Sequence, residues 1–382
     1  MVLVPRKRIE LIPPYQQGDK PLFNQTGGIK LSANESALGP SPKVKGMMLT
    51  ALDSLQWYPD PNAVSVRDSI ARRYKLDFAK ILMGVGSDEL LKNLIASFSG
   101  YGDEVIFSDV TFPLYKTYTL AAGATPVIVP NIDFTVDIEG IIKFLSPKTS
   151  IVIIANPNNP TGTYINNSQL GYLRDKLPEK VLLIIDSAYA EYVDSDEYDS
   201  GAKLVDKTLN TVMTRTFSKI HGLASLRLGW CYGHQDILSV LGRIRSPFNV
   251  SEISQKAGEV AVEDRNFQSE VFKHNNMWKK ILIEELTNLG FYFTGSEGNF
   301  LSIGKTKSIR KSIEDIDKFL RSNNIITRSL EFFGLPNHLR VTIGKGKDME
   351  IFLEVLKFPL FTENVDRGPQ AGDHQAARRR EA

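Results

Sequence analysis

Three apolar runs, each about 30 residues after the last, constrain the fold of this chain most strongly. Residues 150–155 (SIVIIA), 181–185 (VLLII) and 212–217 (VMTRTF) are rich in β-branched and aliphatic side chains and lack the regular polar alternation of a half-exposed strand. Strands of this kind are buried on both faces of their sheet. Helical patterns separate the runs, and this alternation predicts a mainly parallel α/β sheet.

The pattern changes beyond about residue 260, where shorter strands are mixed with helices. This change predicts a second, smaller α+β domain. We expect an N-terminal arm (1–44) that packs with the small domain, a large domain (45–262), a small domain (263–361) and a tail (362–382). The tail is polar and contains almost no apolar residues, so we expect it to be disordered.

The composition excludes several classes of function. With 46 Lys and Arg against 44 Asp and Glu, the formal net charge is +2, so no overall field favours nucleic acid or an anionic membrane. The single cysteine, Cys231, excludes an intrachain disulfide, and the five histidines lack metal-ligand spacing. No apolar run is long enough to span a bilayer. We expect a cytoplasmic protein with no metal, nucleic-acid or membrane partner.

Polar residues follow the predicted strands, at the sheet edge where open α/β sheets bind ligands. Gly86-Ser87-Asp88 follow the first strand, residues 156–162 (NPNNPTG) follow the run at 150–155, and Asp186 follows the run at 181–185. Ser218 and Lys219 follow the run at 212–217. A lysine is costly at the end of a buried strand, because its charge resists leaving water. Its presence there indicates a chemical role.

Pyridoxal phosphate requires this combination of side chains. A lysine amine forms a Schiff base with the aldehyde, and a carboxylate keeps the pyridine nitrogen protonated. Asparagine and tyrosine can hold the phenolic oxygen as an anion. Backbone N–H groups at a helix N-terminus, hydroxyls and an arginine fork, here Arg227, suit the phosphate. Each residue alone has a commoner structural explanation, such as a turn, a cap or a salt bridge, but together they predict this cofactor.

The motifs resemble those of the fold-type I pyridoxal-phosphate aminotransferases, and among these the histidinol-phosphate aminotransferases. The central matching motifs are NPNNPTGT, IDSAYAEY and RTFSKIHGLASLRLGW. Four further motifs of the family match on either side of them: KLSANESALGPSP, WYPDP, GVGSDELL and HLRVTIG. The resemblance covers about residues 10–358. It implies a large domain with a mainly parallel seven-stranded sheet, a smaller α+β domain, and a homodimer with shared active sites.

The resemblance implies a role for each matching residue. Lys219 is the Schiff-base lysine and proton carrier, Asp186 pairs with the pyridine nitrogen, and Tyr189 holds the phenolic oxygen; these three form the catalytic set. The implied cofactor-binding set is Gly86, Ser87, Asp88, Phe112, Asn159, Asp186, Tyr189, Ser218, Lys219 and Arg227, with Tyr58 reaching over from the partner subunit.

Two arginines carry the implied substrate recognition. Arg340 matches a carboxylate-binding arginine, and Arg328 matches a second arginine of the family. Together they would bind the phosphate of one substrate and the carboxylates of the other, because an arginine fork suits both anions. The implied substrate-binding set is Tyr15, Asn34, Asn159, Arg328 and Arg340. Packing of the arm would also explain Tyr15 and Asn34.

The resemblance implies amino-group transfer between L-histidinol phosphate and 2-oxoglutarate in L-histidine biosynthesis. The motifs are also compatible with an aromatic or dual-specificity aminotransferase, and with a phosphothreonine-type decarboxylase. A cofactor-binding regulator is a further class, but it would need a DNA-binding module, and the sequence contains no helix-turn-helix or basic stripe before its last few residues.

Overall fold

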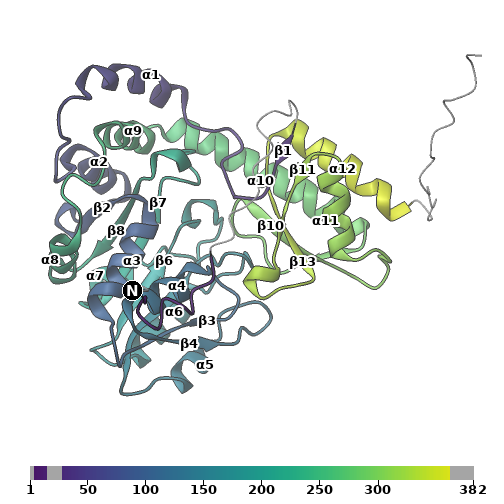
Figure 1. The fold of residues 1–382 in the computed structure, drawn as a ribbon. Coiled ribbons are helices and arrows are strands. Elements are labelled where there is room, and N and C mark those ends of the chain that lie inside the picture. The colour runs from purple at the N-terminus through teal and green to yellow at the C-terminus, as the bar shows by residue number, and fades with distance from the viewer. Residues whose placement is uncertain (1–3, 15–27, 362–382) are drawn as a thin grey trace, which may run out of the picture.

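A computed structural model describes residues 4–14 and 28–361 of the chain. In Figure 1 one lobe is built around a seven-stranded sheet and a second lobe around a four-stranded sheet, and α10 (Arg265–Asn288) runs from the first toward the second. Two of the predictions concern residues outside the described ranges: the disordered tail at 362–382 and the site residue Tyr15.

The large sheet confirms the mainly parallel arrangement. Its strand order is β2-β8-β7-β6-β5-β3-β4. Neighbouring strands are parallel from β7 through to β4, and only β8 runs antiparallel to its neighbours β2 and β7. The strands are β2 (Ile81–Gly84), β3 (Glu104–Ser108), β4 (Thr125–Val129), β5 (Thr149–Ala155), β6 (Leu182–Asp186), β7 (Thr211–Thr216) and β8 (Gly229–Gly233).

The central strands lack polar alternation because both faces of the sheet are covered. Along β5, Ile151 and Ile153 belong to one apolar cluster with α3, α4 and α8, whereas Val152 and Ile154 belong to another with α5 and α6. A third cluster joins α1, α2 and α9 to β7 and β8. The helices are α1 (Pro42–Ala51), α2 (Val64–Tyr74), α3 (Gly86–Phe98), α4 (Leu114–Ala122), α5 (Ile138–Lys143), α6 (Asn167–Lys176), α7 (Ala202–Lys207), α8 (Gln235–Ile244) and α9 (Glu252–Glu263).

The second lobe has an antiparallel sheet of order β12-β13-β10-β9 and its own apolar core. A strand of the arm, β1, pairs in parallel with β11 of this lobe. The elements are β1 (Ile29–Lys30), β9 (Phe291–Phe293), β10 (Phe300–Lys305), α11 (Ile313–Ser322), β11 (Ile325–Ile326), β12 (Arg328–Ser329), β13 (His338–Thr342) and α12 (Gly346–Phe361).

Two local features differ from what the residue pattern predicts. The pattern of apolar runs does not reveal β8, since its sequence GWCYG has a glycine at each end and resembles a turn. The sequence pattern predicts that Gly86-Ser87-Asp88 precede the helix after β2, but the helix begins at Gly86, and these three residues form its first turn. Glu89 supports this earlier start by accepting a hydrogen bond from the N–H of Val85, at 2.6 Å.

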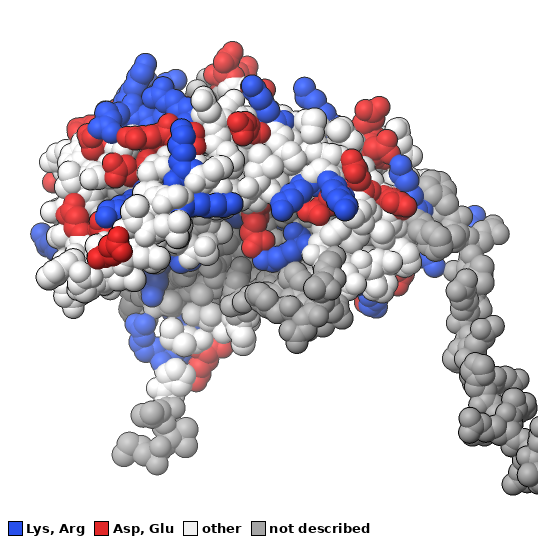
Figure 2. Space-filling model, turned by 90° about the horizontal axis from the view of Figure 1, so that it is seen from above, with Lys and Arg blue, Asp and Glu red and all other residues white. Residues whose placement is uncertain are grey.

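Charge distribution, possible metal ligands and helix hydrophobicity in the described residues bear on the predictions about partners. On the face shown in Figure 2, acidic and basic side chains are interspersed. Within residues 4–14 and 28–361 no cluster of three or more His, Cys, Asp or Glu side chains could hold a metal ion. No helix in that part of the chain has the length and apolar character needed to cross a membrane.

Candidate active site

A cavity of about 360 Å³ lies at the carboxyl ends of the large sheet's strands. Three parts of the chain line it: loops and helix starts that follow the strands, the arm at residues 32–35, and the second lobe. The structure brings most of the predicted site residues to this cavity, namely Asn34, Ser87, Asp88, Phe112, Asn159, Asp186, Tyr189, Ser218, Lys219, Arg227, Arg328 and Arg340.

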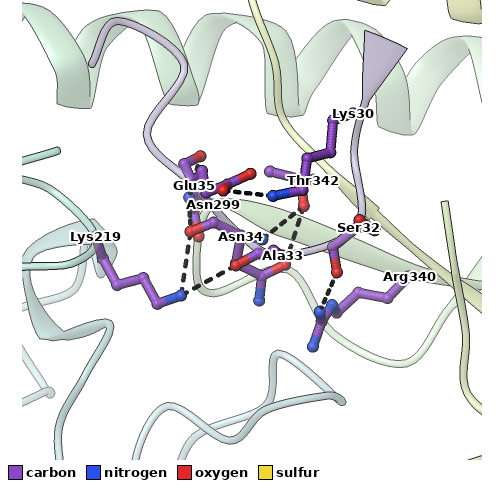
Figure 3. A network of polar contacts seen from close by, with 9 residues as sticks. All are labelled: Lys30, Ser32, Ala33, Asn34, Glu35, Lys219, Asn299, Arg340 and Thr342. Atoms are coloured by element: carbon purple, nitrogen blue, oxygen red, sulfur yellow. Dashed lines mark hydrogen bonds and ion pairs between the residues drawn. The ribbon is translucent and has the colours of Figure 1, made fainter. Parts of the chain in front are cut away.

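Lys219 points across the cavity toward the arm (Figure 3). Its Nζ donates to the backbone carbonyl oxygens of Ala33 at 3.3 Å and Asn34 at 3.2 Å. The same nitrogen lies 5.4 Å from the centre of the Tyr189 ring. Lys219 follows β7 by three residues, so the strand end places the amine in the cavity, as the sequence predicts.

Asp186, the last residue of β6, forms the buried floor of the cavity. Its carboxylate accepts hydrogen bonds from the hydroxyls of Tyr115 at 2.7 Å and Thr214 at 3.1 Å. Burial raises the pKa of Asp186 to about 6, and the two hydrogen bonds oppose this rise. Within the described residues Asp186 forms no ion pair, so its charge is available to a cation in the cavity.

The first turn of α3 and the Lys219 loop form one end of the cavity. Arg227 donates to the hydroxyl of Ser218 at 3.3 Å and to the carboxylate of Asp88 at 3.1 Å. The N–H groups of a helix's first turn have no partner within the helix, and they favour an anion. Hydroxyl, guanidinium and free N–H groups therefore converge where a phosphate would bind.

Glycines keep this end open. Gly86 has φ of +77°, which strains any other residue, and a Cβ there would lie 2.5 Å from Nη2 of Arg227. A Cβ at Gly229 would lie 2.4 Å from the backbone nitrogen of Ser87, a contact that backbone cannot easily relieve. With an anion site at this end and the Asp186 carboxylate on the floor, the residues fit pyridoxal phosphate.

The arm and the second lobe form the opposite wall. Arg340 is 5% exposed. It donates to Oδ1 of Asn159 at 2.6 Å and to the carbonyl oxygen of Ser32 at 2.8 Å. Arg328 lies on the same wall, with its guanidinium 5.7 Å from the ring centre of Phe333. The two arginines thus reach one cavity from different strands of the small sheet.

Tyr58 is the predicted residue that lies away from this cavity. Its side chain is 81% exposed and stacks on Phe248, with ring centres 4.6 Å apart. Its neighbours Leu49, Leu52, Leu55 and Trp57 are also more than half exposed. Asn34, by contrast, is buried and donates from its amide to the Tyr189 hydroxyl at 2.9 Å.

Several contributors to the site are absent from the sequence prediction. Tyr115 and Thr214 hold Asp186, and Phe333 and the Ser32 carbonyl shape the opposite wall. Tyr115 carries a usable signal, because it follows Phe112 by three residues, in the first turn of α4. A backbone carbonyl such as that of Ser32 leaves no signal in the sequence.

Comparisons with known proteins agree with this geometry. The model of the family "Aminotransferase class I and II" matches residues 26–356. The histidinol-phosphate aminotransferase of Maricaulis maris is 40% identical over 356 residues, covering 93% of this chain and 98% of that protein. The enzyme of the same name from Nitrobacter winogradskyi is 42% identical over 342 residues, covering 89% and 94%.

Solved structures share the fold. Histidinol-phosphate aminotransferase from Sinorhizobium meliloti, solved in complex with pyridoxal-5'-phosphate, superposes with a TM-score of 0.80 at 26% identity, covering 86% of this chain and 91% of that one. The enzyme from Clostridium acetobutylicum superposes with a TM-score of 0.79 at 23% identity, covering 86% and 98%, and supports the fold alone. This chain therefore belongs to the class I and II aminotransferases and, among them, to the histidinol-phosphate aminotransferases.

Proposed function

We propose that this protein uses pyridoxal 5'-phosphate to transfer the amino group of L-histidinol phosphate to 2-oxoglutarate, reversibly, in L-histidine biosynthesis. The products are imidazole acetol phosphate and L-glutamate. The observation that carries the proposal is that Arg328 and Arg340 share a cavity with Lys219 and Asp186. One arginine pair can bind the phosphate of the donor and the carboxylates of the acceptor in turn.

The chain's own residues supply binding and proton transfer. Pyridoxal phosphate, when bound, stabilises negative charge at the amine-bearing carbon of the substrate. Lys219 would be the base that takes the proton from that carbon and the acid that returns it to the cofactor's C4′ carbon. The amine begins within hydrogen-bonding distance of the arm, which keeps it inside the cavity. Asp186 would offer its carboxylate to the ring nitrogen, and Phe112, which lines the same cavity, would stack on the cofactor ring.

A homodimer completes the proposal. Tyr58 is exposed together with apolar neighbours, a surface that suits burial against a second copy. We place Tyr58 at the cofactor phosphate of the partner subunit.

We divide the chain into an arm at 1–44, a large domain at 45–262 and a small domain at 263–361. The pairing of β1 with β11 supports the placement of the arm beside the small domain. The single buried cysteine suits a cytoplasmic location.

A half-reaction screen tests the donor. The cofactor-loaded enzyme is mixed separately with histidinol phosphate, phenylalanine, tyrosine and phosphothreonine, and the visible absorbance of the cofactor is followed. We expect the fastest conversion with histidinol phosphate, and regeneration of the starting spectrum by 2-oxoglutarate. Faster conversion by phenylalanine or tyrosine would make it an aromatic aminotransferase, and release of CO₂ from phosphothreonine would make it a decarboxylase. No conversion by any amine would indicate a regulator.

A further inference from the structure

We propose that Asn34 is a positioning residue that fixes the direction of the Tyr189 hydroxyl, so that its proton points to the phenolic oxygen of the cofactor. The inference deepens the proposed site. It rests on the cofactor of the proposed function and not on the identity of its amine donor. Asn34 would therefore act through Tyr189 and need not touch the substrate.

The orientation of the Asn34 side chain follows from its hydrogen bonds to Thr342. The backbone N–H of Asn34 donates to the Thr342 hydroxyl oxygen at 2.9 Å, and that hydroxyl lies 3.1 Å from Oδ1 of Asn34 and donates to it. An amide oxygen accepts and an amide NH₂ donates. In this structure the Thr342 hydroxyl donates to Oδ1, and the NH₂ group faces Tyr189.

The amide then determines where the Tyr189 proton can go. Nδ2 of Asn34 donates to the Tyr189 hydroxyl oxygen at 2.9 Å, in surroundings where both side chains are at most 4% exposed. Since the amide nitrogen has no acceptor capacity, the single phenolic proton must point elsewhere. Lys219, beside the ring, is also a donor. Within the described residues nothing accepts this proton, and the side chain lines the cavity.

The backbone at Asn34 is held independently of its side chain (Figure 3). Asn299 donates from Nδ2 to the carbonyl oxygens of Asn34 at 3.0 Å and Glu35 at 3.1 Å. Asn34 has φ of 55°, which asparagine, aspartate and glycine adopt at little cost. Aspartate and glycine can therefore replace the amide while the segment keeps its shape.

The test follows the pH titration of the bound cofactor's visible absorbance, at saturating cofactor and without any amine donor. In Asn34→Asp, the new carboxylate accepts the Tyr189 proton and draws it away from the phenolic oxygen. A phenolate without that hydrogen bond holds a proton on the cofactor more tightly. We expect the titration midpoint to rise by about one pH unit, the size of one hydrogen bond. Asn34→Gly removes the amide donor without adding an acceptor, so the Tyr189 proton is free to turn but is not drawn away from the phenolic oxygen. We therefore expect a smaller rise of the midpoint in this variant.

The Tyr189→Phe background separates this effect from simple charge. If Asn34 acts through the Tyr189 hydroxyl, neither Asn34→Asp nor Asn34→Gly should move the titration midpoint of the cofactor once Tyr189 is replaced by phenylalanine. Thr342→Ser keeps the orienting hydroxyl and serves as a matched control that should titrate like the parent. A parental midpoint in both Asn34 variants would overturn the proposal, as would a full Asn34→Asp shift in the absence of the Tyr189 hydroxyl. Because no donor is added, failure of the histidinol-phosphate assignment would leave these results unchanged.

Discussion

The two walls of the cavity are built differently. The sheet wall consists of residues at or shortly after strand ends, and the sheet's own hydrogen bonds set the spacing of the strands. Asp186, for example, is in register with Ala155 on one side and Thr214 on the other. The arm wall is assembled by contacts between distant segments, such as Asn34 with Tyr189, 155 residues apart, and Ser32 with Arg340, 308 residues apart.

This difference separates two tasks. The sheet wall holds the groups that would act on the cofactor. They are fixed by a sheet that is covered on both faces. The arm wall holds the arginines that would bind the substrate, and one of them, Arg340, donates a hydrogen bond to the carbonyl oxygen of Ser32. Changes in the sheet wall should therefore affect cofactor chemistry, and changes in the arginines of the arm wall should affect substrate recognition.

The largest expected effect comes from removing the lysine of the sheet wall. Lys219→Ala deletes both the covalent anchor and the base, so turnover with histidinol phosphate and 2-oxoglutarate should fall by about 10⁴-fold or more. Steady-state rates of the variant and the parent measure this, with circular dichroism as a control for folding. Retained turnover would remove the chemical role from the sheet wall.

The sheet wall can be predicted from the sequence far better than the arm wall. The runs at 150–155, 181–185 and 212–217 become β5, β6 and β7, and their carboxyl ends must meet at one edge once the sheet is parallel. That rule alone is enough to bring Asp186 and Lys219 to the same edge of the sheet.

The arm wall lies beyond local reasoning. No periodicity relates Ser32 to Arg340, because their contact depends on how two separately folded lobes and the arm are placed. Resemblance alone points to Arg328, Arg340 and Asn34, and it does not reveal the role of Asn34 beside Tyr189. The strand β8 escapes prediction for a local reason, since its flanking glycines hide a strand that is specified by its pairing with β2 and β7.

A smaller effect should appear in the stability of the cofactor-free protein, which tests the sheet wall alone. Burial raises the pKa of Asp186 to about 6 and lowers the pKa of His221 to about 4. Between pH 4 and 6 the folded state binds the Asp186 proton more tightly than the unfolded state, so this group reduces stability as pH rises. His221 does the reverse, because its unfolded form binds the proton more tightly, and the two contributions nearly cancel.

Asp186→Asn should expose the histidine contribution. The free energy of unfolding of this variant should increase between pH 4 and 6.5 by up to about 3 kcal/mol, whereas that of the parent should change little. Urea unfolding at three pH values measures both. The His221→Gln variant serves as the opposite control and should lose stability over the same range. If Asp186→Asn and the parent had identical pH profiles, the Asp186 carboxylate would have to be either solvated or paired with a cation, and this prediction would be wrong.

The smallest effect, and the sharpest comparison of the two walls, comes from replacing one arginine in each by lysine. Lysine keeps the charge but loses the planar fork, so each change should cost one or two hydrogen bonds, about 10-fold in affinity. Arg227→Lys should weaken cofactor binding and leave the KM for 2-oxoglutarate unchanged at saturating cofactor. Arg340→Lys should raise that KM and weaken cofactor binding less than Arg227→Lys does, because Arg340 hydrogen-bonds to Asn159 and the Ser32 carbonyl, whereas Arg227 bonds to Ser218 at the proposed phosphate end. Cofactor titration and steady-state kinetics on both variants give a two-by-two comparison. If each substitution moved both quantities equally, the walls would act as one unit, and the separation of chemistry from recognition would have to be abandoned.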